Sequence, residues 1–306
     1  MKKFISILAI SSLAIVGILG IPNFAYAGIG VGVAPDFPTT VTAGQTGVSA
    51  GLEITNNSTG DVGSIILDNI FLTPQCGDTN VPCTTPDPGV FSVSASGTGA
   101  NACAANTFTI AVVDVGTGKV QFTPNAAISL ALGATCQINF TVDALKVPTV
   151  DAIPGGSVQT VQGGQVTAYA GQLPGSGTGT DVTTVNKASP EISTTPSAGG
   201  PIGTVLNDTA TLSGGVSPTG SVTFKLFPPS DPTCAGTASY TDTDPSAPYA
   251  TSPGFASNAA GVWHWTADYA GDANNNGASS PCATEAVTVS KIDSQTVTAI
   301  HDAQHN

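Results

Sequence analysis

Two strongly alternating segments in the second half of this 306-residue chain constrain its fold most. Both carry apolar residues at every second position: Val222, Phe224 and Leu226 in the first, and Trp263, Trp265, Ala267 and Tyr269 in the second. A period of two is the period of a β-strand that buries one face and exposes the other. The sequence therefore predicts a β-sandwich with the aromatic row in its core.

The first half of the chain alternates in the same way. Its clearest predicted strands are Ser49–Ile54, with Leu52 and Ile54 inward, and Cys136–Val142, with Ile138, Phe140 and Val142 inward. Further strands are predicted over residues 64–72, 90–93, 107–115, 208–213 and 286–289. No segment after Gly28 repeats apolar residues with the period of a helix. The spacing of strands and turns indicates antiparallel sandwiches.

The beginning of the chain predicts a secretory signal peptide over residues 1–27. Met1–Lys3 is charged, Phe4–Ile21 is apolar, and Ala25–Ala27 has the small-x-small pattern of a cleavage site. The alternative is a membrane anchor, because the apolar run is about 18 residues long. Pro22 and the cleavage pattern favour removal of the segment.

The remaining chain divides at a short, proline-containing stretch, Asn186–Pro190. We expect an N-terminal β-sandwich domain over residues 28–186 and a second domain over residues 187–291. Residues 292–306 are expected to form a tail or the start of another unit. Proline fixes the backbone just before the second domain, so the linker should hold the two domains end to end.

The charge excludes nucleic acid as an expected partner. After cleavage the chain keeps five lysines, no arginine and twenty acidic residues, a net charge of −15. Binding to phosphate backbones requires clustered basic residues, and the five lysines are dispersed along the sequence. The protein is acidic, and an anionic membrane surface would repel it.

Six cysteines in an exported chain predict disulfide bonds. Cys234 and Cys282 must pair if the second domain is self-contained. The first four allow three connectivities, of which we favour Cys76 with Cys83 and Cys103 with Cys136, because each pair brackets a turn-rich loop. The close ligand pairs of a zinc site are absent.

Residues 207–276 resemble the Ig-like repeats of secreted bacterial and archaeal surface proteins. The motifs that carry the resemblance are Asp208–Gly214, Ser217–Leu226, Cys234 and Trp263–Asn274. Residues 28–186 look like the domain that precedes such repeats, and residues 296–306 look like the opening of a further repeat. The resemblance implies an all-β fold of two consecutive Ig-like antiparallel β-sandwich domains after a cleaved signal peptide. It also implies a surface or matrix role and supplies no catalytic residues.

One loop in the second domain partly fits a calcium motif. Asp272, Asn274 and Asn276 stand at alternating positions before Gly277, but Ala283 occupies the position where the motif needs a bidentate glutamate. We therefore interpret the loop as a polar turn and expect no metal and no cofactor. His301 and His305 have a helical zinc spacing, but the segment before them is strand-like.

The sequence predicts no enzyme. The chain has three histidines and no G-x-S-x-G elbow, and its aspartates fall mainly in turn contexts. Sequons for N-glycosylation begin at Asn56, Asn57, Asn139 and Asn207.

Two functions remain open at this point. The first is a non-enzymatic extracellular or cell-surface structural or adhesive protein, whose partners would be cell-surface polymers, other surface proteins, or neighbouring repeats of the same or a longer chain. The alternative is a carbohydrate- or protein-binding module, with Trp263 and Trp265 as the rings that would stack on a sugar. Burial of both rings is expected from the residues that share their face.

Overall fold

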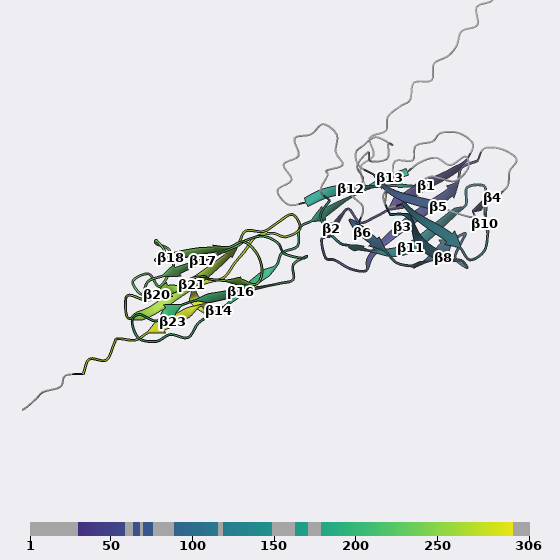
Figure 1. The fold of residues 1–306 in the computed structure, drawn as a ribbon. Coiled ribbons are helices and arrows are strands. Elements are labelled where there is room, and N and C mark those ends of the chain that lie inside the picture. Colours follow the sequence, from purple (N-terminus) through teal and green to yellow (C-terminus); the bar gives the residue numbers. More distant parts are fainter. Residues whose placement is uncertain are drawn as a thin grey trace, which may run out of the picture.

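Paired strands dominate the computed structural model, which describes residues 30–58, 64–67, 70–75, 89–115, 119–148, 163–170 and 179–295. The helical structure in these residues is a single 3-10 turn at Cys282–Thr284. The buried apolar residues form two clusters, and Figure 1 shows two β bodies placed end to end around them. The predicted all-β fold class is confirmed.

The N-terminal body is built around two long antiparallel strands, β3 (Val48–Asn56) and β11 (Thr135–Ala144). β1 (Val31–Asp36) pairs with β3 on one side. Beyond β11 the sheet continues, in spatial order, with β7 (Ser96–Asn101), β8 (Thr107–Asp114), β9 (Lys119–Pro124), β5 (Ile70–Gln75), β12 (Gly163–Ala170), β13 (Gly179–Asn186) and β2 (Thr40–Thr42). β6 (Phe91–Val93) pairs with β11, and β10 (Ile128–Ala131) pairs with β4 (Ser64–Leu67).

This sheet departs from the expected antiparallel sandwich in two ways. β2 runs parallel to β13, and β1 lies against β13, so the sheet curls back on itself. The Phe37 N–H donates a hydrogen bond of 2.6 Å to Asp181 Oδ2 across this closure. The strand predicted over residues 64–72 contributes two strands, because β4 pairs with β10 whereas β5 pairs with β9 and β12.

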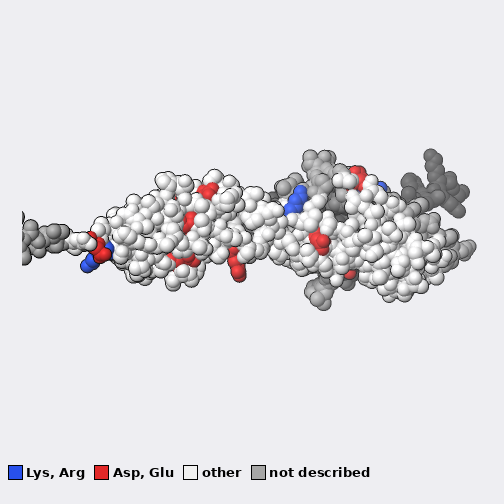
Figure 2. Space-filling model, turned by 60° about the horizontal axis from the view of Figure 1, so that its bottom comes forward, with Lys and Arg blue, Asp and Glu red and all other residues white. Residues whose placement is uncertain are grey.

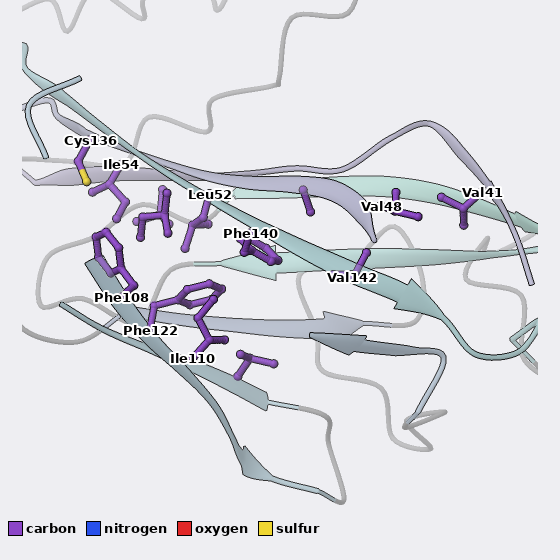
Figure 3. Close-up of a cluster of buried hydrophobic side chains, with 14 of the residues drawn as sticks. Val41, Val48, Leu52, Ile54, Phe108, Ile110, Phe122, Cys136, Phe140 and Val142 are labelled. Atoms are coloured by element: carbon purple, nitrogen blue, oxygen red, sulfur yellow. The ribbon is translucent and has the colours of Figure 1, made fainter. Parts of the chain in front are cut away.

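The alternation predicted for β3 and β11 is confirmed. Leu52, Ile54 and Ile138 are fully buried, whereas Asn139 and Thr141 on the other face of β11 are exposed. Figure 3 shows the core side chains converging from several strands, and the rings of Phe122 and Phe140 lie 5.0 Å apart between centroids. Alternating strands bury a continuous apolar layer in this way.

The C-terminal body is a sandwich of two main sheets. One sheet contains β14 (Glu191–Pro196), β16 (Asp208–Ser213) and β19 (Tyr249–Ala250). The other contains β18 (Tyr240–Asp244), β17 (Val222–Phe227), β21 (Gly261–Tyr269), β22 (Ala278–Ser279) and β23 (Ala286–Val289). A short pair, β15 (Val205–Leu206) with β20 (Phe255–Ala256), lies beside them.

The aromatic row of β21 lies in the core, as predicted. Trp263 and Trp265 are both 0% exposed, and the ring of Trp265 contacts Tyr240 edge-on at 5.9 Å. Leu226 of β17 stands opposite Trp265 in the antiparallel register.

Within the described residues, no helix combines the length and hydropathy that a membrane crossing requires.

Candidate functional site

The two β bodies meet at a short crossing between β13 and β14 that contains the predicted linker. β13 ends at Asn186 and β14 begins at Glu191. Between them, Ala188 is 3% exposed and forms a parallel bridge with Asn275. The Ala188 N–H donates to the Asn274 carbonyl and its carbonyl accepts from the Asn276 N–H, both at 2.8 Å. The crossing is therefore held by backbone hydrogen bonds and does not act as a free tether.

Two further hydrogen bonds join the two bodies, one from outside the linker and one from a linker side chain. The Val147 N–H, which follows β11 in the N-terminal body, donates to Asn274 Oδ1 at 2.9 Å. The Lys187 ammonium donates to the Asp272 carbonyl. Because Val147 and Lys187 approach the β21–β22 loop from different segments, relative rotation of the bodies would break both hydrogen bonds.

An apolar contact complements these hydrogen bonds. Val216 lies in the loop between β16 and β17 of the C-terminal body, yet its side chain packs against the core cluster of the N-terminal body. It approaches Gly44, where a Cβ would lie 2.9 Å from Val216 Cγ2. Gly44 has φ +86°, a left-handed conformation that glycine adopts without strain. The N-terminal body thus leaves room for this side chain.

Asn275 fixes the position of Val216 and is fully buried. Its Oδ1 accepts from the Val216 N–H at 2.7 Å, and its Nδ2 donates to the Val216 carbonyl at 2.9 Å. The same Nδ2 lies 2.8 and 3.0 Å from the two carboxylate oxygens of Asp272. A buried amide with all its groups paired holds two loops in one geometry.

Asp272 organises the β21–β22 loop. Its carboxylate accepts hydrogen bonds from the N–H groups of Thr219, Asn274 and Asn275, the hydroxyls of Thr219 and Tyr269, and the Asn275 amide. Partial burial by itself would raise the pKa of Asp272, but these hydrogen bonds, led by the one from the Thr219 N–H, lower it to about 2. Burial, followed by the bond to Asp272, raises the pKa of Tyr269 to about 12.

The side chains of the three residues that partly fit a calcium motif make hydrogen bonds to different partners. Asp272 accepts hydrogen bonds within its loop, Asn274 accepts from Val147, and Asn276 donates to Ser189 Oγ at 3.1 Å. Within the residues that the structure describes, no group of three or more His, Cys, Asp or Glu side chains could hold a metal ion. The loop functions as the polar turn that its sequence indicates, and it also serves as the joint between the two bodies.

Two of the predicted disulfides are present. Cys103 pairs with Cys136 inside the N-terminal core, with a Cα–Cα distance of 5.1 Å, and both residues are fully buried. Cys234 pairs with Cys282 at 6.0 Å and ties the β17–β18 loop to the 3-10 turn before β23. Cys76 and Cys83 lie outside the described residues, so their predicted pairing stays a prediction.

The structure argues against one of the four predicted glycosylation sites. Asn56 is 0% exposed, and its amide donates to the Leu130 carbonyl at 2.7 Å while its Oδ1 accepts from Ser58. Because the Asn56 side chain is fully buried, the folded structure leaves no space for a glycan on its amide nitrogen. Asn139 is exposed on β11, and Asn57 and Asn207 are partly exposed.

Other sequence candidates are placed as follows. Trp263 and Trp265 are core residues, so the hypothesis that these rings stack on a carbohydrate is wrong. His301 and His305 lie outside the described residues. Charged groups are sparse on the face shown in Figure 2, and the ion pair between Lys225 and Asp268, 2.9 Å apart, is partly exposed.

Sequence reasoning missed most of the joint. It identified the loop at Asp272 as a turn, but it did not identify Val147, Val216 or Gly44 as joint residues. Val216 follows a Gly-Gly pair and precedes a Ser-Pro pair, which is also the pattern of an ordinary loop. This local pattern does not indicate whether an apolar loop residue packs against another body or is exposed to solvent.

Comparisons with known proteins place the chain in no family. No family model matches it, and no curated protein matches it. Among solved structures, it is similar to a candidate membrane-anchored protein of Corynebacterium diphtheriae, with 16% identity and a TM-score of 0.26. The match covers 85% of this chain and 53% of that one, so the chain spans about half the length of that protein. A TM-score this low does not establish a common fold, and the similarity bears on neither architecture nor function.

Proposed function

We propose that this chain is a non-enzymatic extracellular or cell-surface structural protein, in which two β-sandwich domains form one rigid spacer. The observation that carries the proposal is the joint. Val147, Ala188 and Val216 come from three separate segments and all contact across it. Multiple contacts of this kind oppose the relative domain motion that is otherwise the default for two linked domains.

The disulfide bonds of the chain are consistent with an extracellular or cell-surface location. Disulfides such as Cys103–Cys136 and Cys234–Cys282 form and persist in oxidising compartments. The leader over residues 1–27 would direct the chain there, and the net charge of −15 that remains opposes association with nucleic acid. A spacer role needs no cofactor. Its partners would be surface polymers, other surface proteins or neighbouring repeats.

Solution scattering and NMR relaxation test the spacer role on the chain after signal removal. We expect a scattering profile that fits one elongated body, and a common rotational correlation time for amides of both bodies. This result is expected because three segments hold the two bodies together. If a single flexible link joined the bodies instead, their correlation times would be independent.

A matched pair of variants links this result to the joint. Val216→Ser removes the apolar contact with the N-terminal core, whereas Val205→Ser changes an exposed valine of the C-terminal body that lies outside the joint. We expect the first variant alone to separate the correlation times. Two independently tumbling bodies in the unmodified protein would contradict the proposal.

A further inference from the structure

A buried acidic side chain lies inside the C-terminal sandwich, away from the joint. Asp208 is the first residue of β16 and is 1% exposed. Its Oδ1 accepts a hydrogen bond of 2.8 Å from the Thr209 N–H, whereas its Oδ2 is buried without a hydrogen-bond partner. Its backbone N–H donates to Thr251 Oγ1 at 3.0 Å. The carboxyl group is therefore fixed in place and only half satisfied.

A second carboxyl group approaches Asp208 from the opposing sheet. Glu285 is 8% exposed and directly precedes β23. The backbone carbonyl of Glu285 accepts a hydrogen bond from the backbone N–H of Trp265 at 2.9 Å, which ties Glu285 to β21. Its side-chain Oε1 accepts from the Thr284 hydroxyl at 3.3 Å. The charge of Glu285 acts unfavourably on Asp208. The two acidic groups thus belong to different layers of one sandwich.

The surroundings of Asp208 supply no compensating charge. On β14, the residues of the less exposed face are Ile192, Thr194 and Pro196, and those of β16 beyond Asp208 are Ala210 and Leu212. The inward side chains of β21 are Trp263, Trp265, Ala267 and Tyr269, of which Tyr269 is titratable and is bonded to Asp272. Thr251 is neutral. The charged side chain that acts on Asp208 is therefore Glu285, whose effect disfavours the Asp208 carboxylate.

Elementary electrostatics decides which form of Asp208 is stable here. An ionised carboxylate taken out of water without a cation is far more costly than a neutral carboxyl group. Burial, together with repulsion from Glu285, raises the pKa of Asp208 from 3.8 to about 7, against the opposing effects of the backbone groups of Thr209 and, more weakly, Thr195. A protonated Oδ2 carries no charge to be compensated.

We propose that the folded C-terminal body holds Asp208 in its neutral, protonated form, so that a proton is a bound ligand of this sandwich and mild acid stabilises it. The sign follows from linkage. The folded state binds the proton more tightly than the unfolded state, so stability increases as the pH falls from about 7 to about 3.8 and is constant below that. Above about 7 the site is ionised in both states.

Urea unfolding followed by tryptophan emission tests the proposal. Both tryptophans of the chain lie in the C-terminal core, so their emission reports on this body. For the unmodified protein, we expect the unfolding equilibrium constant to fall on the order of a thousandfold between pH 7.5 and pH 4. Asp208→Asn supplies a neutral isostere, and we expect it to be more stable than the unmodified protein at pH 7.5 and to lose most of this pH dependence.

Two further variants make the test specific. Asp293→Asn changes an exposed aspartate outside the sandwich and should leave the pH dependence unchanged. Glu285→Gln removes the repulsion on Asp208 and should move the stability transition to lower pH. In addition, the carboxyl carbon-13 shift of Asp208 should remain that of a neutral acid at pH 5.5, which tests the proposal even if a variant fails to fold.

Two results would overturn the proposal. One is an Asp208→Asn protein that is less stable at pH 7.5 and keeps the original pH dependence, since the carboxylate would then be useful in its ionised form. The other is a strong stabilisation of the unmodified protein by calcium ions at pH 7.5 that Asp208→Asn abolishes. In that case a cation, and not a proton, neutralises the pair.

Discussion

Replacing Asn275 by alanine should weaken the joint and the loop that forms it. The change removes two hydrogen bonds to the Val216 backbone and leaves its N–H and carbonyl without their partner in a partly buried setting. A fully buried backbone group left unpaired costs about 1–3 kcal/mol, and these two groups are partly buried, so we expect a loss of about 2–3 kcal/mol in the free energy of unfolding. The carboxylate of Asp272 loses a donor but keeps its other hydrogen bonds.

The neighbouring Asn276→Ala is a matched control. Asn276 makes one side-chain hydrogen bond, to Ser189 Oγ at 3.1 Å, in an exposed position. A loss of about 0.5–1 kcal/mol is expected for it. Urea unfolding monitored by tryptophan emission measures both variants, and small-angle scattering measures the largest dimension of each. We expect Asn275→Ala alone to reduce rigidity, because Val216 carries the apolar contact with the N-terminal core.

The comparison between the two variants can refute this reasoning. Equal losses of stability would mean that the Asn275 amide is no more important than an exposed one, in spite of its complete burial. A large loss of stability with an unchanged scattering profile would mean that Asn275 supports only its own loop. The joint would then owe its rigidity to Val147 and the linker.

Two other predictions follow from the cores. Replacing Cys103 and Cys136 by alanine opens a loop with a sequence separation of 33 residues and should cost about 4 kcal/mol in the chain-entropy model, measured by calorimetry; no change in the melting temperature would contradict a stabilising role. Iodide should quench the emission of Trp263 and Trp265 only weakly in the folded protein, because both are fully buried, and strong quenching would show that the rings are accessible.

Much of the sandwich architecture was predictable because its signal is local. Leu52, Ile138 and Trp263 each occupy a strand in which every second residue is apolar, and each is buried. The period of a strand follows from its geometry, so no knowledge of its partners is needed. The order of the strands in the sheet, in contrast, could not be predicted from local patterns. The parallel pairing of β2 with β13 joins residues far apart in the sequence, and local patterns do not specify such a pairing.

The joint was less predictable for a related reason. Val147, Val216 and Asn274 come from three loops, and their proximity depends on how the two bodies are oriented. Asp208 is an intermediate case. Its alternation with Ala210 and Leu212 places it on the same strand face as apolar residues, but the depth of its burial depends on the opposing sheet that carries Glu285.

Asp208 and Asp272, the two aspartates of the C-terminal body with the largest pKa shifts, respond to acid in opposite directions, and their pH windows meet. For Asp208, whose pKa is raised to about 7 by burial, stability increases as the pH falls and the gain is complete near 3.8. For Asp272, hydrogen bonds outweigh partial burial and lower the pKa to about 2, so its stabilisation is complete above 3.8 and is lost as the pH falls towards 2. Acidification from neutral pH to about 4 therefore strengthens the sandwich while the joint keeps its charged acceptor. Because the first gain ends where the second loss begins, these two groups together place the greatest stability of this body near pH 4.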